Sequence, residues 1–359
     1  MIILSEDNLA AYIKEHLADK LDFINYAEVQ NVAVVGGGLV SAVFKAKVGN
    51  GNLYFKQAIP GRLDKVKELV GGTVPEDAFV VWYDERQFAE VKALRIFRRA
   101  VTEGFVPLVY HHDTDNNIMV LSEVCGQNGS VLADVMNEEI NLKHAEILGT
   151  NIARVANHTY GKFEALRDEA LEKKIKAIKY RYEVGEVWTN ISDSNKKNYI
   201  IKKVSDFVKT SSKKNIVLVH GDYHDRNILV CGDNCATYDL EESHWGDPVE
   251  DIGKLATSYI LRIIYFHQIR QIAYEATLKL IESYFETLSI PEPRDVLENR
   301  IRVMIAGCLL MRVDGISSMW LPWVHDDAKK ELTRQLAVKL VLGNPQFSIK
   351  EILNQTNVI

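Results

Sequence analysis

The first part of the chain is organised by alternation of hydrophobic and polar residues, which is the pattern of strands. Alternating and β-branched residues predict strands near 28–35, 39–47, 52–58, 106–110 and 117–124. Helical periodicity precedes and interrupts these strands, over residues 6–19 and about 84–101. The run Gly49-Asn50-Gly51 is typical of a hairpin turn. The pattern therefore predicts a β-rich N-terminal unit with helices packed on its sheet.

Helical spacing of hydrophobic residues dominates from about residue 130 onward. The ranges expected to be helical are about 142–160, 163–182, 195–211, 251–287, 293–316 and 326–341. One β-type island at 216–240 interrupts them. The polar, glycine-containing segment that begins at Cys125 has the composition of a linker. We therefore expect an α+β chain of two domains, residues 1–125 and 126–359.

Length and composition support two globular units. A chain of 359 residues exceeds the usual size of a single core. Its 47% hydrophobic and 26% charged residues are typical of globular proteins. The net charge of −6 offers no broad basic face for nucleic acid. Charges interrupt the apolar stretches, including Arg262 within 259–266, so no membrane span is expected. Four cysteines in or beside apolar stretches indicate buried thiols and a cytoplasmic location.

The island ends in a pattern suited to binding a hard cation. If the strand after Asn227 pairs with the strand before Asp239 about a turn centred on Asp233, then Asn227 faces Asp239. Directly opposed residues have Cβ atoms roughly 5 Å apart. An amide oxygen and a carboxylate would then converge on one ion, for which Mg²⁺ is the natural occupant. Asp222 lies on the preceding loop and can accept a hydroxyl proton, an arrangement that suits phosphoryl transfer.

The ordered set His220-Gly221-Asp222, Asn227 and Asp239-Leu240-Glu241 resembles a known catalytic loop and metal motif. It is similar to that of the aminoglycoside phosphotransferase and choline kinase superfamily. The resemblance implies a protein-kinase-like two-lobed fold, with a β-rich N-lobe and a mainly helical C-lobe. It implies Asp222 as catalytic base, and Asn227 and Asp239 as metal ligands with help from Glu241. Taken singly, each of these residues could equally be a turn or cap residue.

Two further residues are implied to support the loop. The resemblance gives His220 a structural role. The run Gly246-Asp247-Pro248 and Asp251 resemble the segment that follows the metal site in the superfamily. There, an aspartate at the start of a helix steadies the catalytic loop.

The nucleotide side is predicted from glycines and a lysine. Gly36, Gly37 and Gly38 lie between two predicted strands and resemble a phosphate-covering loop, although a plain glycine hairpin fits them equally. Lys56 could be an outward-facing strand residue. In the resemblance it occupies the position of the lysine that pairs with nucleotide phosphates and a helix carboxylate.

The carboxylate partner of that lysine is expected on the helix near residue 90. Glu90 is preferred over Glu85 because Phe88, Val91 and Leu94 define a neighbouring buried face. A solvated Glu90 is the alternative.

The resemblance also implies where adenine binds and which acceptor residues matter. The backbone around Glu123 and Cys125 would hydrogen-bond adenine. The chain is most similar to methylthioribose kinase, in which two adjacent substrate arginines occur where this chain has Met311 and Arg312. Arg312 is therefore the candidate substrate residue, and methylthioribose is expected to be a poor substrate. Further pocket candidates are Met311, Asp314 and Trp320, the last of which could equally be a packing residue.

The expected ligands are ATP, Mg²⁺ and a small hydroxylated metabolite, a sugar or amino alcohol, and a homodimer is compatible with this expectation. Two other classes of protein would leave different traces in the sequence. A protein kinase would carry an Ala-Pro-Glu element after a long activation segment, but few residues separate Asp239 from Gly246. A nucleotide-binding pseudokinase that acts through protein partners would lack a base, metal or lysine position, and all of these positions are filled.

Overall fold

The computed structural model describes most of the chain. The described residues are 1–21, 29–36, 41–59, 84–126, 129–164, 166, 194–211, 216–315, 318 and 321–355. They form two compact units, the first made of Met1–Gln127 with Ala236–Glu242 and the second of Asn128–Cys235 with Ser243–Ile359. The chain thus leaves the second unit at residue 236, contributes a short segment to the first unit, and returns.

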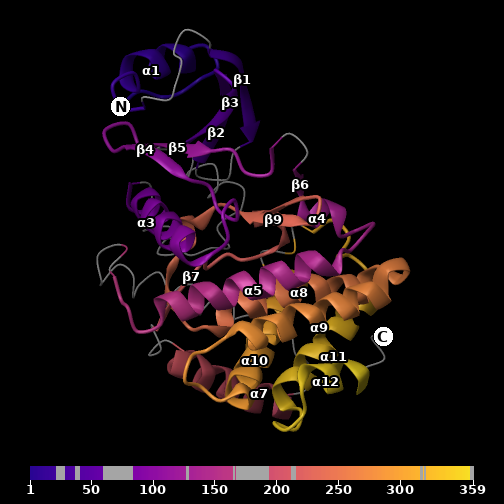
Figure 1. Cartoon of the computed structure of the whole chain (residues 1–359). Helices are drawn as coiled ribbons and strands as arrows, with labels where there is room; N and C mark the ends of the chain where they lie inside the picture. The colour runs from indigo at the N-terminus through magenta and orange to yellow at the C-terminus, as the bar shows by residue number, and fades with distance from the viewer. Residues whose placement is uncertain are drawn as a thin grey trace. The chain divides into compact units, whose positions relative to one another are not determined.

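A five-stranded antiparallel sheet is the centre of the first unit (Figure 1). Its strands in spatial order are β1 (Val29–Gly36), β2 (Ser41–Val48), β3 (Gly51–Ala58), β5 (Ile118–Ser122) and β4 (Val109–Asp113). These strands lie at or near the five predicted ranges, although β4 begins at Val109 and not at residue 106 as predicted. The register pairs Lys56 with Val43 on one side and with Met119 on the other, so Lys56 lies on the central strand.

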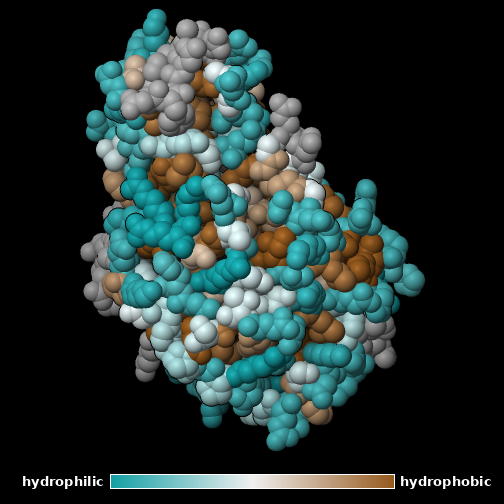
Figure 2. Space-filling model, viewed as in Figure 1, coloured by the Kyte–Doolittle hydropathy of each residue, from teal (hydrophilic) through white to brown (hydrophobic). Residues whose placement is uncertain are grey.

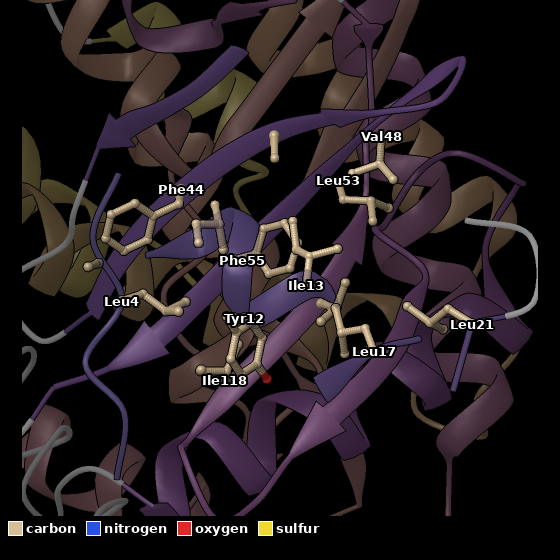
Figure 3. Close-up of a cluster of buried hydrophobic side chains, with 14 residues drawn as sticks. Leu4, Tyr12, Ile13, Leu17, Leu21, Phe44, Val48, Leu53, Phe55 and Ile118 are labelled. Carbon is tan, nitrogen blue, oxygen red and sulfur yellow. The ribbon is translucent and has the colours of Figure 1, made fainter. Parts of the chain in front are cut away.

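One face of this sheet is covered by α1 (Leu9–His16), which supplies the core shown in Figure 3. Tyr12, Ile13 and Leu17 point toward side chains of β2 and β3 such as Phe55. The Tyr12 hydroxyl also donates a hydrogen bond of 2.7 Å to the Asp113 carboxylate. The helix is shorter than the predicted range of 6–19, since it begins at Leu9 and ends at His16.

The helix α3 (Asp84–Ala100) carries the residue expected to pair with Lys56. Val91 and Leu94 are buried as predicted, at 3% and 2% exposure. Phe88 is 40% exposed and contacts the edge of the His112 ring, so its assignment to the buried face was wrong. Gln87 takes part in the buried face instead, donating from its amide to the main-chain oxygens of Lys56 and Asn117.

The second unit is mainly helical. Its longer described helices are α5 (Leu142–Thr159), α7 (Ser194–Ser211), α8 (Val249–Tyr265), α9 (Arg270–Thr287), α10 (Arg294–Val313), α11 (Asp327–Leu342) and α12 (Ile349–Gln355). Gly149 permits close packing of α5 on α9, since a Cβ there would lie 2.2 Å from the Leu280 carbonyl oxygen. The predicted helix over 251–287 was wrong as a single element. It is interrupted at Phe266 and by a turn of 3₁₀ helix, η8 (His267–Ile269). The predicted helix over 163–182 falls mostly outside the described residues.

Short strands and turns position the candidate catalytic segment. A two-stranded sheet pairs β7 (Val217–Val219) with β10 (His244–Gly246). A three-stranded sheet contains β6 (Ser130–Val131), β8 (Ile228–Cys231) and β9 (Asn234–Thr237), and α4 (Leu132–Val135) follows β6. The hairpin turn is Gly232-Asp233, so its centre lies between these residues and not at Asp233 as predicted.

These elements confirm the predicted fold class, α+β and protein-kinase-like, with a β-rich N-terminal unit and a mainly helical C-terminal one. None of the described helices combines the length and the apolar character that crossing a membrane requires. Hydrophilic and hydrophobic residues are interspersed on the visible face of the second unit (Figure 2).

Candidate active site

Asp251 organises the loop that follows β7. It lies in the first turn of α8, and its carboxylate accepts hydrogen bonds from the backbone N–H groups of His220 (2.8 Å) and Gly221 (3.1 Å). Burial raises the pKa of Asp251, although the electrostatic interaction with His220 and the two N–H donors act in the opposite direction. The prediction that Asp251 steadies the loop is confirmed by these contacts.

The backbone at Gly246 lies close to the Glu250 side chain, and this close packing helps to place Asp251. Gly246 ends β10 just before α8, and a Cβ at this position would lie 2.4 Å from a carboxylate oxygen of Glu250. Glu250 in turn accepts from the backbone N–H of Asp247 at 2.8 Å and contacts His244 at 3.0 Å. Asp247 is buried and forms an ion pair with Arg300. The predicted Gly-Asp-Pro segment is therefore a rigid entry into α8.

His220 is fully buried and braces the same loop. Its ring packs edge-on against Tyr223, with centroids 5.1 Å apart. Its Nδ1 accepts a hydrogen bond of 3.3 Å from the backbone N–H of Asp222. Gly221, between the two, adopts a φ of +84°, a conformation that favours glycine. These contacts agree with the structural role that the resemblance implied for His220.

The Asp222 carboxylate is held by two neighbours on its own loop. The Asn227 amide nitrogen lies 3.2 Å from Asp222 Oδ2 and 2.9 Å from the Asp222 main-chain oxygen. His224 Nε2 lies 3.3 Å from the same Oδ2. His224 Nδ1 accepts from the backbone N–H of Arg226, so the neutral ring carries its proton on Nε2, facing Asp222. Two donors therefore fix the orientation of this carboxylate.

A pocket of the second unit contains Asp222. Its lining residues come from the loop, from α8 and from the end of α10, and they are Asp222, His224, Lys254, Thr257, Cys308, Met311 and Arg312. The structure thus brings the predicted base together with the predicted substrate residue Arg312 and with Met311. Asp314 forms an ion pair of 2.6 Å with Arg334. Trp320 lies outside the described residues.

Behind the pocket, a buried ion pair holds the 3₁₀ turn η6 (Asp225–Asn227) against α8. Asp225 lies 2.6 Å from Arg262 and accepts from the Ser258 hydroxyl at 3.1 Å. Burial would raise the pKa of Asp225, but Arg262, and then His224 and Arg312, hold it below its ordinary value. Asn227 is the last residue of this turn, so the ion pair also fixes Asn227.

A second cluster of charged residues lies in the first unit, on β3, α3 and the segment 236–242. Lys56 Nζ lies 2.7 Å from Glu90, 2.5 Å from Asp239 and 3.4 Å from Glu241. The Leu240 backbone N–H also donates to Glu90, at 3.1 Å. The structure brings Lys56, Glu90, Asp239 and Glu241 together, and it confirms the pairing of Lys56 with Glu90.

Charge is unbalanced in this cluster, which shifts several pKa values. Burial would lower the pKa of Lys56, but the surrounding carboxylates raise it well above its ordinary value. Burial raises the pKa of Glu90 to about 7, with Asp239 and Glu241 adding to the effect and Lys56 opposing it. Burial and Asp239 likewise raise the pKa of Glu241. Three carboxylates therefore share one buried ammonium group.

The acidic side chains of this cluster could also hold a metal ion. Glu90, Asp239 and Glu241 each offer an oxygen, and these oxygens lie within 4.8 Å of one another. Asp239 has a φ of +64°, and it is followed at once by the 3₁₀ turn η7 (Leu240–Glu242). This backbone reversal places Asp239 and Glu241 on the same cluster. Carboxylate oxygens are hard ligands, and their negative charge exceeds the positive charge of the cluster, so these residues fit Mg²⁺.

The predicted adenine and phosphate residues are described only in part. Gly36 ends β1, whereas Gly37 and Gly38 lie outside the described residues. The Glu123 side chain accepts hydrogen bonds from Lys45, Asn52 and Tyr54. These contacts fix the end of β5, and the adenine role of the backbone at Glu123 and Cys125 stays a prediction.

Sequence reasoning assigned no site role to three residues with ionisable side chains. His224 and Lys254 line the pocket, and Lys254 donates a short hydrogen bond to the Gly221 carbonyl oxygen. Arg86 pairs with Glu241 at 2.8 Å in the first unit. The available signal for Lys254 was a lysine flanked by apolar residues in a helix whose residues are otherwise suited to a core.

Comparison with known families decides the identity of the chain. The sequence model of the phosphotransferase enzyme family, APH, matches residues 32–278, more than half of the chain. The chain belongs to this family. No curated protein sequence matches it. Membership of the phosphotransferase enzyme family agrees with the superfamily that the catalytic loop and the metal motif predicted.

A solved structure shares the fold of this phosphotransferase family member, and two others are similar to it. A choline/ethanolamine kinase family protein from Mesorhizobium loti is 17% identical, with 94% of each chain covered and a TM-score of 0.52. An ethanolamine kinase from Plasmodium vivax is 13% identical, with 94% of this chain and 95% of that chain covered and a TM-score of 0.49. The APH(2″)-IIa protein, in a ternary complex with streptomycin and ATP, is 13% identical over 95% and 99%, with a TM-score of 0.49.

Proposed function

We propose that this phosphotransferase moves the γ-phosphate of ATP to a hydroxyl group of a small molecule. One observation carries the proposal: the buried Lys56 is paired with Glu90 of α3 while it also contacts Asp239. A lysine held in this way by a helix carboxylate is the phosphate-binding element of kinase-type sites. Membership of the phosphotransferase enzyme family supports the same reaction class.

The reaction assigns a distinct role to each group. The acceptor oxygen forms a bond to the γ-phosphorus, and the bond from that phosphorus to the β,γ-bridging oxygen breaks, leaving its electron pair on ADP. Asp222 takes the acceptor proton, because His224 and Asn227 hold its carboxylate in one orientation. Lys56 binds phosphate oxygens, and Glu90 holds the Lys56 side chain in place through two hydrogen bonds.

Mg²⁺ fits the carboxylates of the first unit. Asp239 would hold the ion with help from Glu241, and their excess of negative charge over Lys56 and Arg86 supports this assignment. When bound, the ion neutralises charge on the phosphate oxygens. The ligand role of Asn227 remains part of the proposal on the strength of the motif alone.

Acceptor-dependent release of ADP tests the proposal. The full chain is assayed with ATP, Mg²⁺ and a panel that includes methylthioribose, choline, homoserine and an aminoglycoside. We expect ADP release with at least one acceptor, and its loss in Asp222→Ala. Asp233→Ala is the matched control, since Asp233 lies in the exposed hairpin turn and bonds only Asn141 among the contacts described. Nucleotide binding without turnover on any acceptor would contradict the proposal and favour a binding protein.

A further inference from the structure

Arg312 differs from the other inward-facing arginines of the second unit. Arg262, Arg300 and Arg334 each form an ion pair with an aspartate. Arg302 donates to four main-chain oxygens and to the Asn299 side chain. Within the described part of the chain, the guanidinium group of Arg312 has no hydrogen bond or ion pair. It is half-buried and lines the pocket that contains Asp222.

The nearest carboxylate behind the pocket is already engaged. Asp225 interacts electrostatically with Arg312, but its oxygens bind Arg262 and the Ser258 hydroxyl. Arg312 therefore presents a planar set of N–H donors to the pocket. Such a fork matches a carboxylate or a phosphate, which can accept two of these donors at once.

The other described lining residues of the pocket include a second cationic side chain and few groups that would bind a cation. Lys254 lies in the same pocket, where its ammonium group donates a hydrogen bond to the carbonyl oxygen of Gly221. Among the described lining residues, Asp222 is the single carboxylate and His224 the single ring. Ammonium groups of ligands are bound by carboxylates or by aromatic faces, and the described part of the lining offers only these two groups. Two of the described lining residues, Lys254 and Arg312, have cationic side chains.

We propose that the acceptor is a hydroxylated small molecule with an anionic group, a carboxylate or a phosphate, which Arg312 binds while Asp222 faces the hydroxyl. This inference rests on the proposed function, because it identifies the acceptor class of that reaction. Lys254 supplies a second positive charge at the same pocket. A cationic amino alcohol is disfavoured by both side chains.

Matched compounds test the proposal directly. Three share a three-carbon diol: glycerate is anionic, glycerol is neutral and 3-amino-1,2-propanediol is cationic. Gluconate, sorbitol and glucamine form the same series on six carbons. Glycerol 3-phosphate distinguishes phosphate from carboxylate. Binding to the full chain with Mg²⁺ and ADP is measured by calorimetry, and turnover with ATP by ADP release.

We expect an anionic member of a series to bind at least about tenfold more tightly than its neutral and cationic partners, as for a charge-assisted hydrogen bond. Arg312→Gln should reduce that preference by about 10- to 100-fold without changing the KM for ATP, and Arg312→Lys should restore part of it. Arg294→Gln is the control, because Arg294 lies at the other end of α10, where it pairs with Glu282.

The two proposals fail in different ways. The proposal of an anionic acceptor is overturned if a neutral or cationic compound binds more tightly or turns over faster than its anionic partner. It is also overturned if all compounds bind equally or if no anionic compound binds. An unchanged preference in Arg312→Gln overturns the role of Arg312. ADP release with a neutral or cationic acceptor would leave the proposed kinase activity standing in each case.

Discussion

Replacing Asp251 by asparagine should slow catalysis without removing any group that touches the substrates. The carboxylate accepts from two successive backbone N–H groups, those of His220 and Gly221. Asparagine retains one acceptor oxygen and replaces the other by an NH₂ donor. One backbone N–H is then left facing a donor, next to the residue that carries the proposed base.

The size of the effect follows from burial and charge. A hydrogen bond to a charged group contributes about 1.5–3 kcal/mol, and one such bond is lost. Burial raises the pKa of Asp251, so removing the charge also relieves part of a desolvation cost. We therefore expect the free energy of unfolding to fall by about 1–2 kcal/mol. Displacement of Asp222 by the relaxed loop should lower kcat by about 10- to 100-fold.

Urea denaturation and steady-state ADP release measure the two effects separately, with the KM for ATP expected to stay nearly constant. Glu250→Gln is the matched control. Glu250 is the neighbouring buried carboxylate, and its described hydrogen bonds are with Asp247 and His244. It should lose stability by a similar amount and keep its kcat. If both variants lost kcat equally, or Asp251→Asn kept the wild-type kcat, the positioning role of Asp251 would be refuted.

Three further outcomes are expected. Asp222→Ala should lower kcat by about 10²–10⁴ while ATP binding, measured by calorimetry, is retained; wild-type turnover in a folded variant would remove Asp222 as the base. Asp239→Asn should raise the Mg²⁺ concentration needed for half-maximal activity, and an unchanged titration would contradict its role as a ligand. Burial alone would raise the pKa of Asp113, but hydrogen bonds from Asn116 and Tyr12 lower it. The stabilisation that the Asp113 carboxylate contributes is therefore complete above the pKa of the unfolded chain, about 4, and is lost as the pH falls through the lower pKa of the folded protein. The difference in urea midpoint between wild type and Asp113→Asn should therefore shrink on acidification, and a constant difference would exclude this linkage.

Prediction of the fold succeeded where the hydrophobic period was clear. Strands were found at or near all five predicted ranges, although β4 begins three residues later than predicted and β5 has four apolar residues in succession instead of alternation. The break at Phe266 could not be predicted, because every residue of α8 is buried and the sequence through the break contains no glycine or proline. The strand β10 has three residues, too few for alternation to be recognised.

Prediction of the candidate site succeeded where a motif specified residue types. Lys56 and Glu90 were paired correctly, although one of the reasons, burial of Phe88, was wrong. Lys254 and His224 could not be assigned in this way. Their place in the pocket depends on how α8 meets the loop, and that arrangement comes from distant pairs such as Asp251 with His220.

The short segment Ala236–Glu242 has a consequence for cutting the chain into parts. A fragment that ends at residue 127 would contain the whole five-stranded sheet, α1 and α3, but it would lack this segment. Lys56 would keep Glu90 and lose Asp239, and Arg86 would lose Glu241. The first unit is therefore not a contiguous stretch of sequence. An isolated version needs residues 236–242 supplied again, joined by an artificial linker or added as a peptide.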